Sequence, residues 1–135
     1  MLAGGSEVLG YAAEASLLAG ELEAAQRQVD EALQVAKALE ERVYLPQLFL
    51  IEAGIARARG EAAAARASVR RAVAEARAEE APWLELMALL ELCGHDGATA
   101  KERQALAALV DQLPEAADTT AVTRARALLG KTKAA

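Results

Sequence analysis

The sequence predicts an all-α fold: three antiparallel helix pairs followed by a short final helix. A forty-residue repeat places Gly20-Glu21 before an alanine-rich stretch, as it does Gly60-Glu61. Apolar residues recur at helical spacing, and no segment shows the period-two alternation of a strand. The composition is 54% hydrophobic but only 3% aromatic, and alanine, the strongest helix former, makes up the difference. At 135 residues, the chain is expected to form a single domain over residues 1–130.

The first helix pair is expected over residues 6–40. Ser6 is the predicted N-cap of its first helix. The apolar face of that helix is expected to contain Val8, Leu9, Ala12, Ala15 and Ala19. Gly20 ends the helix, because glycine readily takes the left-handed conformation found at helix C-termini. Glu21 then opens the second helix, which runs to about Glu40 with a stripe that includes Ala25, Val29 and Ala32.

The second helix pair is expected over residues 42–79. Pro46 lies in the first turn of its first helix, where the missing N–H is not needed for a hydrogen bond. Gly60 ends that helix as Gly20 ends the earlier one. The following helix is expected to bury the repeated stripe of Ala65, Val69 and Ala72. Its outer side carries Arg66, Arg70, Arg71 and Arg77, which are interpreted as a solvated charged face, with a phosphate or RNA site as the alternative.

The third helix pair, over residues 82–113, keeps the register but loses the turn glycine, since Ala100 stands forty residues after Gly60. Pro82 begins a helix that is apolar almost all round, which predicts burial on both sides. Residues 94–97 form a turn, and the next helix runs from about Thr99 to Leu113.

A capping helix is expected over residues 119–129, with Asp118 or Thr119 as its N-cap. Gly130 is expected to end it, and residues 131–135 to form a flexible basic tail. Terminal units of repeat arrays are commonly atypical because one of their faces is a cap.

The spacing of Gly20, Ala25 and Ala32, repeated at Gly60, Ala65 and Ala72, resembles that of tetratricopeptide repeats. In those repeats, small residues lie where the two helices of a hairpin cross closely. The resemblance implies a right-handed superhelix of about three antiparallel hairpins with a C-terminal capping helix. It also implies a groove lined by the first helix of each hairpin.

A narrower resemblance covers residues 20 to 129. The order of several segments is similar to the C-terminal repeat region of large bacterial signal-transducing ATPases, which pair a repeat array with a DNA-binding or nucleotidyl-cyclase output domain. These segments are Gly20–Ala25, Ala81–Leu90, Glu115–Thr119 and Ala125–Leu129. The ATPase and output domains have no counterpart in this sequence. The resemblance therefore implies only a role in interaction or regulation, in signalling or transcription, without catalysis.

The groove predicted by the repeat register is lined by residues from the first helix of each pair. Leu50 is a candidate contact, because an apolar side chain in an exposed groove marks an interaction surface. Arg57 is a candidate anchor for an acidic group of a peptide partner. The full predicted lining is Tyr11, Glu14, Leu18, Gln47, Leu50, Gly54, Arg57, Met87, Leu90 and Glu91.

The remaining chemistry-bearing residues predict no active site. His95 is interpreted as a solvated turn residue, and Cys93 as a buried small hydrophobe. Trp83 is either an interface anchor or a packing residue. No phosphate-binding loop, metal-binding histidine pair or activated nucleophile is present, so we expect no enzyme activity, no cofactor and no metal.

Charge and cysteine content narrow the classes of partner and the cellular compartment that we expect. A net charge of −5 argues against direct nucleic-acid binding, which needs a basic footprint. The N-terminus does not have the pattern of a signal peptide, and no apolar run is long enough to span a membrane. A single cysteine fits a reducing compartment, so a cytoplasmic location is expected. The leading hypothesis is a module that binds a protein or peptide. The alternative is a homodimer formed through the apolar helix that begins at Pro82 or through the exposed N-terminal hairpin.

Overall fold

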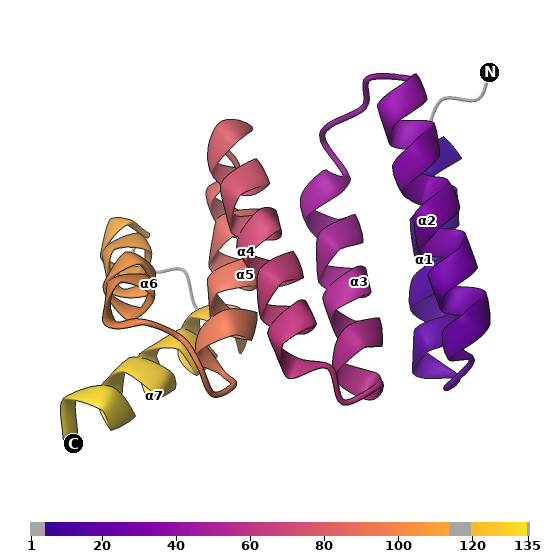
Figure 1. Cartoon of the computed structure of the whole chain (residues 1–135). Helices are drawn as coiled ribbons and strands as arrows, with labels where there is room; N and C mark the ends of the chain where they lie inside the picture. The colour runs from indigo at the N-terminus through magenta and orange to yellow at the C-terminus, as the bar shows by residue number, and fades with distance from the viewer. Residues whose placement is uncertain (1–4, 114–119, 135) are drawn as a thin grey trace.

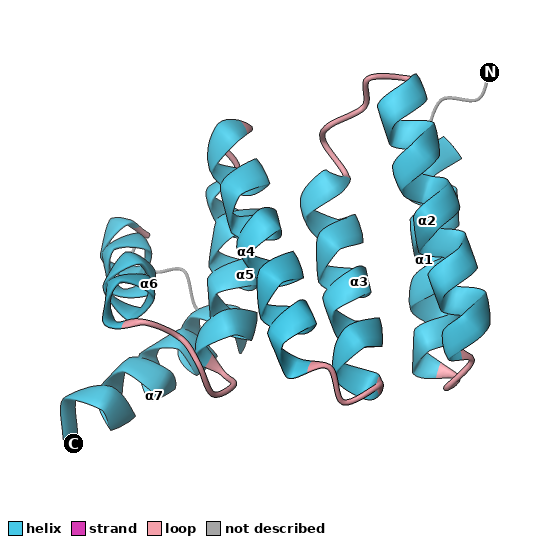
Figure 2. Ribbon diagram, in the orientation of Figure 1, coloured by secondary structure: helices cyan, strands magenta, loops and turns pink. Residues whose placement is uncertain are grey.

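The computed structural model describes residues 5–113 and 120–134, with side chains described up to residue 130. This part of the chain contains helices joined by turns and no strand, which confirms the all-α prediction (Figure 2). The helices are α1 (Gly5–Leu18), α2 (Leu22–Ala38), α3 (Leu45–Ala58), α4 (Ala62–Ala78), α5 (Pro82–Cys93), α6 (Ala100–Gln112) and α7 (Thr120–Ala134).

Consecutive helices pack against one another along the chain, and α1 to α5 run in alternating directions, whereas α7 lies obliquely to them (Figure 1). The odd-numbered helices also contact each other, α1 with α3, α3 with α5, and α5 with α7. In addition, α7 contacts α6, so it meets both helices of the preceding pair, as α3 meets α1 and α2. The odd-numbered helices therefore form one layer, and α2, α4 and α6 each pack against their neighbours in that layer.

The predicted alanine-rich stripes are the centre of the packing. Ala25, Val29 and Ala32 of α2 are fully buried, and so are their forty-residue counterparts Ala65, Val69 and Ala72 of α4. Two apolar clusters result, one among α1, α2 and α3 and one running from α3 to α7. Helix α3 contributes to both, with Ile55 in the first and Ala53 in the second. It is therefore the helix that joins the two halves of the core.

The first four helices all end in the same left-handed turn. Gly20 and Gly60 have φ values of 79° and 77°, and Glu40 and Glu80 have values of 55° and 52°. After each of them, the next N–H donates to the carbonyl five residues earlier, as from Glu21 to Ser16 at 2.8 Å. This is the hydrogen bond of a Schellman C-cap. The turn thus recurs every twenty residues, although glycine occupies only every second one.

The buried face of α1 differs from the prediction. The structure buries Ser6, Gly10 and Ala13, whereas Val8 is 66% exposed and Ala15 is also exposed. The prediction is wrong for Val8, Ala15 and Ala19, which are exposed, whereas Leu9 and Ala12 are half-buried and Leu9 packs against the first apolar cluster. The helix instead presents its smallest residues to α2 and α3, because close helix approach leaves no room for larger ones.

Both ends of the helical array also differ from the prediction. Ser6 is not an N-cap: it lies inside α1, and its Oγ donates to Oε1 of Glu41 at 2.6 Å. Helix α7 continues through Gly130 to Ala134, so the predicted end at residue 129 and the flexible tail over residues 131–135 are wrong as far as Ala134. The proposed caps Asp118 and Thr119 lie outside the described residues.

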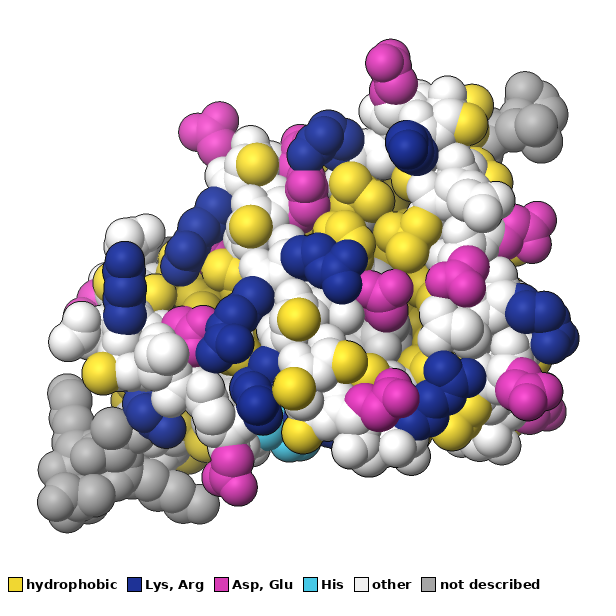
Figure 3. Space-filling view, viewed as in Figure 1, with side chains coloured by type: hydrophobic (Ala, Val, Ile, Leu, Met, Phe, Trp, Pro, Cys, Tyr) yellow, Lys and Arg dark blue, Asp and Glu magenta, His cyan; other side chains and the backbone are white. Residues whose placement is uncertain are grey.

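The arginines of α4 link neighbouring helices. Arg70 Nε lies 2.7 Å from Glu102 of α6, and Arg77 Nε lies 2.7 Å from Glu85 of α5. Arg71 lies 3.8 Å from Glu52 of α3. Figure 3 shows basic and acidic side chains interspersed across one face of the molecule. The predicted solvated charge run is therefore a set of exposed ion pairs between helices, each of which adds little to stability on its own.

Reciprocal substitutions at the repeated turn should change stability in opposite directions. Gly60→Ala should lower the free energy of unfolding by about 1 kcal/mol, because an L-residue is strained at positive φ. A Cβ there would contact nothing within 4 Å. The loss of stability therefore measures backbone strain alone, without a contribution from side-chain clashes. Glu80→Gly should raise it by about 0.5–1 kcal/mol for the same reason. Urea unfolding measures both, and an unchanged Gly60→Ala would contradict the role given to this turn.

Candidate functional site

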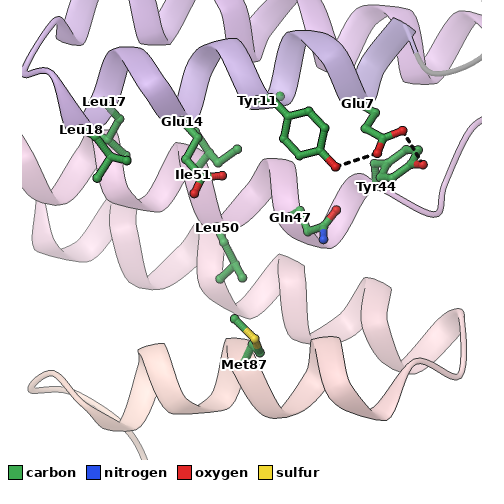
Figure 4. A pocket seen from close by; sticks show the side chains of 11 residues that line it. Glu7, Tyr11, Glu14, Leu17, Leu18, Tyr44, Gln47, Leu50, Ile51 and Met87 are labelled. Carbon is green, nitrogen blue, oxygen red and sulfur yellow. Dashed lines mark hydrogen bonds between the residues drawn. The ribbon is translucent and has the colours of Figure 1, made fainter. Parts of the chain in front are cut away.

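A groove lies on the layer of odd-numbered helices. It encloses about 360 Å³ between α1, α3 and α5, and its lining is mostly apolar (Figure 4). Its two ends differ in chemistry: Glu7, Tyr11 and Tyr44 lie at one end, and Leu17 and Leu18 at the other. The lining residues are Glu7, Gly10, Tyr11, Glu14, Leu17, Leu18, Tyr44, Gln47, Leu50, Ile51 and Met87.

Two glycines allow the close approach of α1 and α3 beneath the groove. A Cβ on Gly54 would lie 2.7 Å from Leu17 Cδ2, and a Cβ on Gly10 would lie 3.0 Å from Leu48 Cδ2. Each glycine therefore accommodates a leucine of the opposite helix. A larger residue at either glycine would displace the leucine opposite it. At Gly54 that leucine is Leu17, which lines the groove, so the substitution would reshape the groove.

The polar end of the groove is organised by Glu7. The hydroxyl of Tyr11 donates to Oε1 of Glu7 at 2.7 Å, and the hydroxyl of Tyr44 donates to Oε2 at 2.7 Å. These bonds lower the pKa of Glu7, with the Tyr11 bond contributing most. They also raise the pKa of both tyrosines, because deprotonation would remove a donor beside a carboxylate. Glu7 is thus held as an anion with two aromatic rings beside it.

Six of the ten residues predicted to line the groove line this hollow. They come from three different helices, as the repeat register required. The six are Tyr11, Glu14, Leu18, Gln47, Leu50 and Met87.

The other four predicted residues, Gly54, Arg57, Leu90 and Glu91, lie outside the groove lining. Leu90 is only 4% exposed and belongs to the core between α3 and α7. Arg57 is directed at the neighbouring helix instead, with its Nε 4.0 Å from Oε1 of Glu91. Leu90 was misplaced because α5 is apolar on nearly all sides, so its sequence does not show which leucines face the groove.

Glu7 and Tyr44 belong to the site but were not among the predicted residues. The Glu7–Tyr11 spacing of four residues was a usable signal, since such side chains are neighbours on one helix face. Tyr44 offered no such signal, because it precedes α3 and reaches Glu7 only through the folding of the array.

The other reactive side chains lie away from the groove. Cys93 is partly buried, and burial is the main cause of its raised pKa. His95 Nε2 lies 3.1 Å from Oε1 of Glu91, so the turn histidine has a neighbour on α5. Within residues 5–113 and 120–134, no group of acidic, histidine or cysteine side chains could hold a metal ion, and no helix is long and apolar enough to cross a membrane.

Comparison of the chain with protein-family models, with curated proteins and with solved structures finds no match.

Replacing Glu7 with glutamine should move the ionisation of the two tyrosines to lower pH. The Glu7 carboxylate raises the pKa of both above the ordinary value of 10.0, so its loss removes that effect. Tyr11 and Tyr44 are the only tyrosines of the chain, and an ultraviolet titration of tyrosinate therefore reports on them alone. Glu31→Gln, on the exposed side of α2, is the control. Identical titration curves for Glu7→Gln and the native chain would contradict the arrangement.

Proposed function

We propose that this chain is a tetratricopeptide-like repeat module that binds a peptide or protein segment in the groove on α1, α3 and α5. The observation that carries the proposal is the convergence of side chains from these three helices on one apolar hollow. Tyr11 and Met87 in its lining are 63% and 51% exposed. Large apolar side chains gathered in an exposed hollow are typical of an interaction surface.

The repeat geometry supports this assignment. In tetratricopeptide-like arrays the first helix of each hairpin lines a concave surface, and here α1, α3 and α5 contact one another in order. Turns of one type at residues 20, 40, 60 and 80 give the successive pairs a common register. We propose that the pairs build a right-handed superhelix. By its resemblance to the repeat regions of bacterial signal-transducing ATPases, the module would regulate a cytoplasmic signalling or transcriptional output.

A charge placed in the apolar part of the groove should weaken peptide binding. Random peptides displayed on phage and retained by the full chain provide the probes, and the strongest of them is synthesised for affinity measurement. Met87→Glu should weaken its binding by about tenfold or more, because a contact worth roughly 1.5 kcal/mol is lost and a charge faces apolar atoms. Leu39→Glu is the matched control, since Leu39 is 48% exposed and lies outside the groove. Equal binding by both variants would rule out the groove.

Self-association is a second candidate, favoured by the exposed face of α1. Forty residues after Val8 and Ala15 stand Leu48 and Ile55, which are 1% and 0% exposed in the cluster shared with α2. The corresponding positions of α1 have no such cover, and Val8 is 66% exposed. A second copy packed on this face would cover it as α2 covers α3.

The oligomeric state tests this second candidate. If two copies of the chain pack through α1, the molar mass measured by light scattering should approach twice the 14.1 kDa of one chain as concentration rises. Val8→Glu should return it to the single-chain mass, because a buried unpaired charge opposes association. If the native chain remains a monomer at every concentration, the self-association hypothesis is wrong.

A further inference from the structure

The groove carries one sign of charge. Its lining includes two acidic side chains, Glu7 and Glu14, and no lysine, arginine or histidine. Residues 1–40, which contain both acids, carry seven acidic and only two basic side chains. A low-dielectric hollow with charges of one sign concentrates its field on whatever enters.

The two acids differ in the interactions that their carboxylates already make. Glu7 accepts hydrogen bonds from two tyrosine hydroxyls, but a carboxylate has about four acceptor positions and can accept more. Glu14 is exposed and forms no ion pair with a described residue. By contrast, several glutamates on other faces pair with the arginines of α4 or with Arg42. The groove thus keeps negative charge that the chain itself does not neutralise.

The charges and the apolar surface are arranged in order along α1. Glu7 and Tyr11 lie in its first half, Glu14 follows, and Leu17 and Leu18 lie at its end (Figure 4). Glu7 and Leu18 are eleven positions apart, which corresponds to roughly 16 Å of helix. The aromatic rings beside Glu7 add a surface on which a cation is favourable.

We propose that the groove selects a segment in which a lysine or arginine faces Glu7 and Glu14 while apolar side chains fill the hollow beside Leu17, Leu50 and Met87. This rests on the proposed function, since it names the chemistry of the segment that the groove would bind. The order along α1 sets the spacing. For a basic residue beside Glu7 and an apolar one beside Leu18, the two would lie about eleven positions apart in a helical partner and about five apart in an extended one; for a basic residue beside Glu14 they would lie about four and about two positions apart.

Random peptides displayed on phage and selected separately on the native chain and on two variants test this preference for a basic, apolar segment, which we call the charge rule. The native chain should retain peptides enriched in lysine or arginine together with leucine, methionine or phenylalanine. Glu14→Arg should lose the basic enrichment and gain aspartate or glutamate. Glu31→Arg, which reverses an exposed acid of α2 outside the groove, should retain the native pool. Circular dichroism and urea unfolding verify that both variants keep the native fold.

A charge exchange on one synthetic peptide completes the test. The strongest peptide of the native pool should bind Glu14→Arg about five- to tenfold more weakly. Changing its basic residue to glutamate should reverse that preference. Added salt should weaken the native complex, because the attraction is between partly exposed charges.

The possible failures separate the two proposals. Peptides that lose binding on Met87→Glu but show no basic enrichment, or no response to Glu14→Arg, would overturn the charge rule and leave groove binding intact. If no retained peptide loses binding on Met87→Glu, both the proposed function and this inference fail.

Discussion

The left-handed residue that ends each of the first four helices is the constraint on which the array depends. At Gly20, Glu40, Gly60 and Glu80 the chain reverses in the same way, and each reversal is closed by an N–H donating to a carbonyl five residues back. Because the turns are alike and α2 and α4 have the same length, the second pair repeats the geometry of the first. The strain at the two glutamates shows that this geometry is maintained by packing even where the residue type does not favour it.

Given those turns, small residues determine how closely the helices approach. Alanines at the centres of α2 and α4 have no exposed surface, and they have no bulk that would keep neighbours apart. Gly10 and Gly54 extend the same principle to the contact between α1 and α3, where each accommodates a leucine of the other helix. The chain builds its core from small side chains at short range rather than from aromatic rings. The groove is a consequence, since its floor lies where α1 and α3 meet.

Charged side chains are paired differently on α4 and in the groove. On α4, arginines reach acids of α3, α5 and α6 and so lie across the helix boundaries of one face. In the groove, Glu7 accepts hydrogen bonds from two tyrosine hydroxyls, and Glu14 forms no ion pair with a basic side chain that the structure describes. The same composition, acidic overall, thus gives a self-neutralised outer face and a groove with residual negative charge. The proposed preference for a basic, apolar segment follows from that contrast.

The sequence by itself determined the helical class, most helix boundaries and the repeated stripe of Ala25, Val29 and Ala32, because these depend on local spacing and on glycine and proline positions. It also predicted that Tyr11, Leu50 and Met87 share one groove, because a constant repeat length places equivalent positions of successive helix pairs on the same face. Only the tertiary structure decided which face of α1 is buried, since close packing favours Ser6 and Gly10 over the more hydrophobic Val8. It likewise decided that Leu90 is core and that Tyr44 reaches Glu7, because both depend on how distant helices lie against each other. Local patterns specify which segments are helical, whereas the side that each helix presents is set by the shape of its neighbours.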